Sequence, residues 1–268
     1  KPMQITLLGT GTPTPNPDRR GPSQVIRAGA ENILVDCGSG VVTRLVEAGL
    51  RPPEINHLLI THHHEDHSGN AARIRQHTGV VPFAPQQARH KLTNGYYTPP
   101  LQRLIWGSPQ PVDTAPYPEQ ITLSDGSPVI PVHTPGHAKD LTCFFLPEQK
   151  YLFSGDMYIA RSLKHFRSDE NLQQLIDSLN TLLALDFDIL FCPHRGIVED
   201  GYQALKDKRD NLLELCAKAQ ELARQGIKPR AITRRILGRE DMTTLISMGN
   251  ISRQHLINQA LSVSLPSS

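Results

Sequence analysis

The chain has 268 residues, of which 38% are hydrophobic and 20% are charged, and its formal net charge is +2. This composition is typical of a folded globular chain and argues against a disordered or strongly basic protein. No apolar run approaches the roughly 20 residues that span a bilayer, so we expect no membrane partner. Four widely spaced cysteines without a Cys-x-x-Cys pair favour small buried side chains in a reducing, cytoplasmic setting. The first residues show no signal-peptide pattern, although a chain that does not begin with Met leaves a removed signal open.

Strand and helix patterns alternate over the first 200 residues. β-rich runs are predicted at Gln4–Leu8, Ser23–Ala28, Ile33–Asp36, Ile55–Thr61, Val129–His133, Thr142–Leu146, Tyr151–Ser154 and Ile189–Cys192. Helices are predicted at Gly40–Ala48, at Asn70–Thr78 and, from the spacing of leucine and isoleucine, at 172–183. The stretch Tyr96–Pro118 is rich in proline and aromatic residues, which favours an irregular loop or lid.

The C-terminal third has a different character. Helices are predicted at Gln203–Gln225, at Ala231–Leu237 and from Ser252 to about Val263, with Ser252 suited to cap the last one. We therefore predict an α/β catalytic domain at residues 1–200, with two sheets and helices outside them, followed by a helical extension at 201–268.

A histidine cluster follows the run that ends at Thr61. Four of the twelve histidines fall between residues 62 and 67. Neutral imidazoles and carboxylates bind first-row metal ions, and alternate residues of an extended turn point the same way. His62 and His64 are therefore expected to hold one metal ion, and Asp66 and His67 a second, while His63 points away.

Four ordered segments resemble the metallo-β-lactamase superfamily. They are the His62-x-His64-x-Asp66-His67 pattern, Thr134-Pro135-Gly136-His137, Phe153-Ser154-Gly155-Asp156 and Cys192-Pro193-His194-Arg195-Gly196. The resemblance spans roughly residues 3–200. It implies a four-layer αβ/βα sandwich with a metal site at one edge, ahead of the C-terminal helical extension. It also implies that the metal ligands are His62, His64, Asp66, His67, His137, Asp156 and His194.

The chemistry expected from this resemblance is hydrolysis. Two divalent ions would ionise a bridging water, and the hydroxide would attack the substrate. Zn is the first expectation, with Fe or Mn as alternatives. Asp66 is expected to orient the hydroxide and to move its proton, and Tyr158 to donate a hydrogen bond to an oxyanion.

The substrate class stays open between two interpretations. The Gly-Asp form at Asp156 and the C-terminal helices resemble glyoxalase II and lactonase relatives, which favours a small-molecule ester, thioester or lactone. The opening run from Leu8 to Pro13 resembles ribonuclease Z and related phosphodiesterases, which keeps nucleic acid as an alternative partner. Arg230, Arg234, Arg235 and Arg239 form a modest basic run, better explained by a solvated helix face than by RNA contact. A non-hydrolytic effector, an iron dioxygenase and a homodimer also stay open.

Overall fold

The computed structural model describes residues 3–11, 19–96 and 109–265. The chain forms two compact units. Unit 1 comprises Lys1–His133, Asp140–Asp156 and Phe187–Gly201, and unit 2 comprises Thr134–Lys139, Met157–Asp186 and Tyr202–Ser268. Each unit therefore draws on several stretches of sequence, and the domain boundary expected after residue 200 stays a prediction.

Unit 1 contains two six-stranded sheets. The first has the order β1-β2-β3-β4-β5-β6, with β1 Gln4–Gly9, β2 Ser23–Ala28, β3 Glu31–Val35, β4 His57–Leu59, β5 Phe83–Ala84 and β6 Ala115–Pro116. The second has the order β13-β12-β10-β9-β8-β7, with β7 Ile121–Thr122, β8 Pro128–His133, β9 Thr142–Leu146, β10 Tyr151–Phe153, β12 Ile189–Cys192 and β13 Gly196–Val198. The bounds of β2, β9 and β12 are those the sequence predicted.

Side chains along the central strands of the first sheet alternate between two hydrophobic clusters, one on each face of the sheet. Val25, Leu34 and Leu58 belong to a cluster that includes residues of α1 and α3, whereas their neighbours Ile26, Ile33 and Leu59 join Phe144 and Phe153 of the second sheet. Side chains of a strand point alternately to opposite faces, so the first sheet is apolar on both sides. Each such side chain contributes about 1.5–3 kcal/mol when buried.

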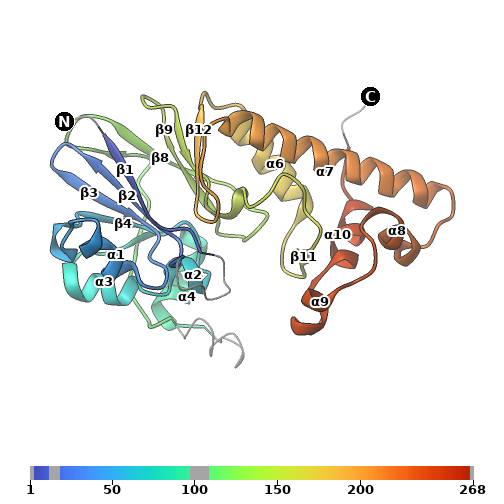
Figure 1. The fold of residues 1–268 in the computed structure, drawn as a ribbon, viewed down its shortest axis with the longest axis horizontal. Helices are drawn as coiled ribbons and strands as arrows, with labels where there is room; N and C mark the ends of the chain where they lie inside the picture. The colour runs from blue at the N-terminus through green and yellow to red at the C-terminus, as the bar shows by residue number, and fades with distance from the viewer. Residues whose placement is uncertain (1–2, 12–18, 97–108, 266–268) are drawn as a thin grey trace. The chain divides into compact units, whose positions relative to one another are not determined.

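Helices cover the outer face of the first sheet in unit 1, where α1 and α3 lie beside the strands β1–β4 (Figure 1). The helical elements here are α1 Val41–Glu47, the 3-10 turn Pro52–Glu54, α2 Glu65–Ser68, α3 Ala71–Thr78 and α4 Gln86–Asn94. Gly79 ends α3 with φ +75°, a left-handed conformation that glycine adopts without strain. Helix α4 was not predicted, because its segment carries no strong apolar periodicity.

Unit 2 is mainly helical. Its helices are α6 Leu172–Leu183, α7 Gly201–Arg224, α8 Pro229–Ile236, α9 Met242–Ile246 and α10 Arg253–Ala260, and it contains the strand pair β11 Phe166–Arg167 with β14 Ile251–Ser252. The first residue of α7, Gly201, still belongs to unit 1. The predicted bounds of α6 are confirmed, and so is the cap of α10, where Ser252 accepts from the His255 backbone N–H. Helix α9 and the β11–β14 pair were not predicted. None of the helices in the described ranges is both long and apolar enough to cross a membrane.

Candidate metal centre

The histidine segment leaves the first sheet just after β4 and turns into the short helix α2. His62 and His64 are alternate residues before this helix, and their Nε2 and Nδ1 atoms lie 2.9 Å apart. The helical turn then presents Asp66 and His67 in succession, with His67 fully buried. The expected sharing of this segment between two metal ions stays a prediction.

Asp156 reaches the histidines from the end of β10. The turn before it needs glycine, because Gly155 has φ +46° and a Cβ there would lie 2.9 Å from Leu141 Cδ1 and 3.2 Å from Thr61 Cβ. One carboxylate oxygen of Asp156, Oδ1, lies 3.2 Å from His67 Nε2, and the other, Oδ2, lies 4.0 Å from His62 Nε2. The carboxylate thus presents different oxygens to different histidines.

His194 follows β12 and is also buried. Its Nε2 lies 3.0 Å from Asp156 Oδ1 and 3.9 Å from Asp66 Oδ2. Unit 1 therefore brings together residues that are separated by more than 130 positions in the chain.

Two groups of metal-ligand types result within unit 1. His62, His64 and Asp156 form one, and Asp66, His67 and His194 form the other; within each group the ligand atoms lie within 4.8 Å of one another. Six of the seven predicted ligands are thus gathered in this unit. His137 belongs to unit 2, where its Nδ1 lies 2.6 Å from Glu170 Oε1. Its place in the ligand set stays a prediction.

Hydrogen bonds at Nδ1 orient the imidazole rings. His62 Nδ1 lies 3.0 Å from Thr61 Oγ1, His67 Nδ1 lies 2.7 Å from Asp36 Oδ2, and His194 Nδ1 lies 2.7 Å from the Gly11 carbonyl. An oxygen partner at Nδ1 leaves the Nε2 lone pair for a metal ion, which is the usual arrangement around metal-binding histidines. Every one of these rings presents Nε2 to the centre.

Asp36 was missed by the sequence analysis. It stands directly after β3 with φ +60°, a conformation that aspartate tolerates better than most residues. Its buried carboxylate accepts from the Thr61 backbone N–H at 2.8 Å and from Thr61 Oγ1, besides holding His67. A polar residue at the end of an apolar strand was the signal that could have found it.

His63 lies apart from both groups, as expected. Its Nδ1 lies 2.9 Å from Asp140 Oδ1, and its Nε2 accepts from Lys91 Nζ at 2.9 Å. The Tyr96 hydroxyl donates to the His63 carbonyl, and burial raises the pKa of that hydroxyl. Through these hydrogen bonds His63 anchors the segment between β4 and α2, and it does not face the metal centre.

Clustered carboxylates control the ionisation of the centre. Burial alone would lower the pKa of His67, but the neighbouring carboxylates, with Asp156 first, raise it well above its usual value. The pKa of His194 is raised in the same way, against burial and chiefly by Asp156. Burial would raise the pKa of Asp156, yet His194 and His67 bring it well below its usual value. The carboxylates therefore give the centre an electrostatic potential that attracts positive charge.

The residues of the centre fit divalent metal ions. The donors are imidazole nitrogens and carboxylate oxygens, the set that suits first-row metals. Among the described residues, the buried His67 Nε2 makes no hydrogen bond, although it lies within 3.2 Å of Asp156 Oδ1. A buried nitrogen of this kind is costly unless something uses its lone pair, and a bound cation does so.

Other predicted features lie away from these groups. Tyr158 belongs to unit 2 and is buried, and its role as a hydrogen-bond donor stays a prediction. All four cysteines are buried and outside disulfide bonds, which confirms them as small core residues; they are Cys37, Cys143, Cys192 and Cys216. Of the expected loop Tyr96–Pro118, residues 97–108 lie outside the described part, and β6 occupies Ala115–Pro116.

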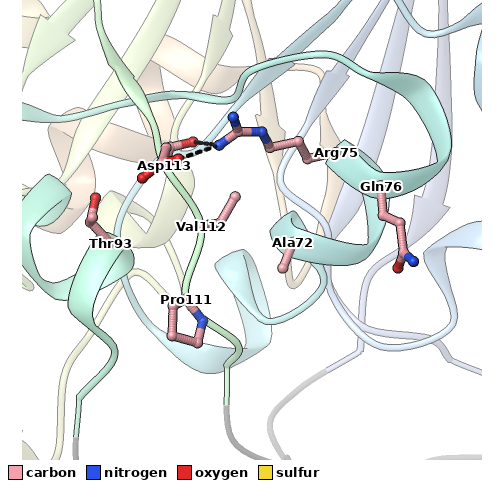
Figure 2. A pocket seen from close by; sticks show the side chains of 7 residues that line it. All are labelled: Ala72, Arg75, Gln76, Thr93, Pro111, Val112 and Asp113. Carbon is pink, nitrogen blue, oxygen red and sulfur yellow. Dashed lines mark hydrogen bonds and ion pairs between the residues drawn. The ribbon is translucent and has the colours of Figure 1, made fainter.

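A hollow of about 400 Å³ lies beside α3 and α4 in unit 1 (Figure 2). Arg75 Nη1 donates to the Asp113 carbonyl at 2.9 Å and pairs with its carboxylate at 3.2 Å, which ties the segment before β6 to α3. The other lining side chains include Ala72, Thr93 and Val112. None of these lining residues is a histidine or cysteine.

Comparison with a family model places the centre in context. The model described as the metallo-beta-lactamase superfamily matches residues 17–194, which include every predicted metal ligand. Among solved structures, a metallo-beta-lactamase family protein from Thermus thermophilus superposes with a TM-score of 0.66 at 18% identity, over 96% of this chain and 91% of that one. The metallo-beta-lactamase MIM-1 from Novosphingobium pentaromativorans gives 0.57 at 17% identity, over 76% and 86%. These likenesses confirm the expected α/β fold class.

Curated relatives match a shorter part of the chain. Ribonuclease Z of Mycobacterium bovis (strain BCG / Pasteur 1173P2) is 44% identical over 86 residues, which are 32% of this chain and 31% of the relative. Ribonuclease Z of Mycobacterium tuberculosis (strain H37Rv) is 52% identical over 64 residues, or 24% and 23%. The matches therefore span about a third or less of the length of these relatives.

Proposed function

Because this chain belongs to the metallo-β-lactamase superfamily, we propose that its histidine and aspartate centre is the site of a metal-dependent hydrolase that cleaves phosphodiesters. The observation that carries the proposal is the common orientation of His62, His67 and His194, each with an oxygen at Nδ1 and with Nε2 directed to the centre. The sequence alone favoured esters, thioesters or lactones. The relatives named ribonuclease Z favour the phosphodiester interpretation instead.

We assign the metal ligands as the sequence predicted. The two groups would hold two divalent ions, Zn first and Fe or Mn as alternatives, with His137 joining His62 and His64. Asp156 would serve both ions, since its two oxygens face different histidines. Bound divalent ions polarise a phosphoryl oxygen and lower the pKa of coordinated water to about 7.

Asp66 is the proposed proton carrier. Its side chain is 17% exposed, against 7% for Asp156, so it is the carboxylate of the pair with better access to solvent and substrate. It would orient the attacking water, accept its proton and pass that proton to the leaving oxygen. Tyr158 would donate a hydrogen bond to the negative charge that develops on the substrate. We also propose, as the sequence suggested, that the chain forms a homodimer and is cytoplasmic.

A panel of substrates tests the proposal. The purified chain, analysed for Zn, Fe and Mn, should turn over bis-p-nitrophenyl phosphate faster than p-nitrophenyl acetate, a thioester or a lactone. The control Arg73→Gln, on the exposed face of α3, should match the parent. Ester or lactone turnover without diester turnover would restore the interpretation that the sequence favoured. Protein that retains no transition metal would remove the basis for either interpretation.

A further inference from the structure

A groove in unit 1 gathers positive charge from three distant segments. It has a volume of about 650 Å³ and lies between the end of β1, helix α1 and strand β13. Its charged lining consists of Arg19, Arg20, Arg44 and Arg195, together with Glu47. We call this feature the arginine groove.

The charge of the arginine groove exceeds that of the whole chain. Four arginines and one glutamate give it a net charge of +3, while the chain as a whole carries +2. The remainder of the molecule is therefore slightly negative. A local surplus of this kind attracts polyanions even where the total charge is nearly balanced. The linear sequence hides it, because the arginines come from positions 19–20, 44 and 195.

The arginine groove shares backbone with the metal centre. Arg195 directly follows His194, and Arg19 Nη2 donates to the His194 carbonyl at 2.8 Å and to the Thr10 carbonyl at 2.5 Å. Gly11, one residue beyond Thr10, supplies the carbonyl that holds His194 Nδ1. Arg19 is thus a structural tie between groove and centre, while Arg20 and Arg195 are exposed and Arg44 is half-buried.

The side-chain chemistry suits a chain of phosphates. Guanidinium groups bind phosphate oxygens through paired N–H donors, and several in a row suit successive phosphates better than one isolated anion. The Arg44–Glu47 ion pair, 2.7 Å long and partly exposed, is weak enough to yield to a phosphate. Ile197 lines the same groove with 55% of its surface exposed and offers an apolar contact to a ribose or base.

We propose that the arginine groove binds the phosphodiester backbone of an RNA strand whose scissile phosphate lies at the metal centre. The inference rests on the proposed function and narrows it, because it makes the substrate a polynucleotide rather than a small diester. Small diesters fill only the centre and gain nothing from charges placed along a groove. A polynucleotide gains one phosphate contact for each guanidinium it passes.

Binding without cleavage tests the groove separately. The full chain is kept in EDTA, and the anisotropy of a fluorescein-labelled RNA oligonucleotide is measured across a salt series for the parent, Arg20→Gln, Arg44→Gln and Arg195→Gln. Each variant should weaken binding roughly three- to tenfold and reduce the slope of log K against log salt by about 0.7, the value for one lost phosphate contact on a single strand. Arg73→Gln, an exposed arginine of α3 outside the groove, is the matched control and should bind like the parent.

The outcomes separate this inference from the proposed function. Groove variants that bind RNA as tightly as the parent, or a loss in Arg73→Gln equal to theirs, would overturn the groove. Turnover of bis-p-nitrophenyl phosphate by the parent alongside unaltered RNA binding in the groove variants would leave the hydrolase standing without it. Groove-dependent RNA binding without diester turnover would support the groove and sink the proposed function.

Discussion

The buried side chains of the metal centre in unit 1 differ in their partners from three buried polar side chains of unit 2. In unit 2, Ser178, Thr233 and Lys208 each donate to a nearby backbone carbonyl, at 2.7, 3.0 and 2.5 Å. In unit 1 the buried histidines and carboxylates face one another, and His67 Nε2 is left without a hydrogen bond among the described residues. The hydrogen bonds in unit 2 satisfy polar groups that folding buries. The cluster in unit 1 instead keeps metal-ligand atoms available, and it is stable only with a bound cation or added protons.

The contrast predicts which changes damage chemistry and which damage folding. Substitutions at the centre of unit 1 should alter turnover and metal content before they alter stability. Substitutions in the helical core of unit 2 should do the reverse.

The largest effect is expected from Asp156→Ala. Both proposed ion sites lose a shared ligand, so kcat/KM for bis-p-nitrophenyl phosphate should fall on the order of a thousand-fold. Elemental analysis should show loss of bound metal, and the thermal midpoint of the metal-free protein should change little. Asp113→Ala, with a side chain 73% exposed, is the matched control and should keep parental turnover. Near-parental turnover in fully metallated Asp156→Ala would break the contrast.

Leu256→Ala tests the helical core of unit 2. Leu256 is fully buried on α10, and the truncation should cost about 2–5 kcal/mol of unfolding free energy because it leaves a cavity. Urea unfolding measures the cost, and metal content per folded molecule should stay parental. Leu245→Ala on α9, where the leucine is 70% exposed, should change stability by less than about 0.5 kcal/mol. Equal losses in the two variants would contradict the assignment of Leu256 to the core.

Asp36→Asn sharpens the contrast within unit 1. The amide keeps the size of the side chain but loses the charge that holds His67 Nδ1, so the affinity for metal should fall about 10- to 100-fold. Competition with a chromophoric chelator measures this loss directly. A purely structural role would lower the thermal midpoint of the metal-free protein and leave the relative affinity for metal unchanged, which would refute the positioning role.

Local sequence patterns explain how much of the fold and of the candidate site could be predicted. Strong periodicity predicted β2, β9, β12 and α6 to the residue, and the spacing of His62, His64, Asp66 and His67 marked the centre. Short elements without an apolar stripe were missed, such as α9, whose Met242 and Leu245 are exposed. Their formation depends on tertiary contacts that no local window contains.

Partners of the site residues were harder to predict than the residues themselves. Asp36 reaches His67 across 31 positions, and the Gly11 carbonyl reaches His194 across 183. A backbone carbonyl has no sequence signature at all. The arginine groove was invisible for the same reason, since its charges meet only after β1, α1 and β13 pack together.

The smallest expected effect concerns a surface carboxylate of unit 2. Asp241 pairs with Arg253 at 2.6 Å and accepts from the Thr243 backbone N–H at 3.0 Å, which together lower its pKa to about 2. A lowered pKa stabilises the folded state above the unfolded value near 4, and this contribution disappears as pH falls from about 4 through 2.

Asp241→Asn isolates that charge, because asparagine still caps α9. Its thermal midpoint should lie below that of the parent at pH 7, and the gap should close between about pH 4 and 2. The gap should be small, since the Asp241 side chain is 38% exposed and solvent screens the pair. Carboxyl NMR of the parent should show this group titrating near pH 2; titration near 4, or a gap that is constant with pH, would mean that the Arg253 pair does not hold Asp241 in solution.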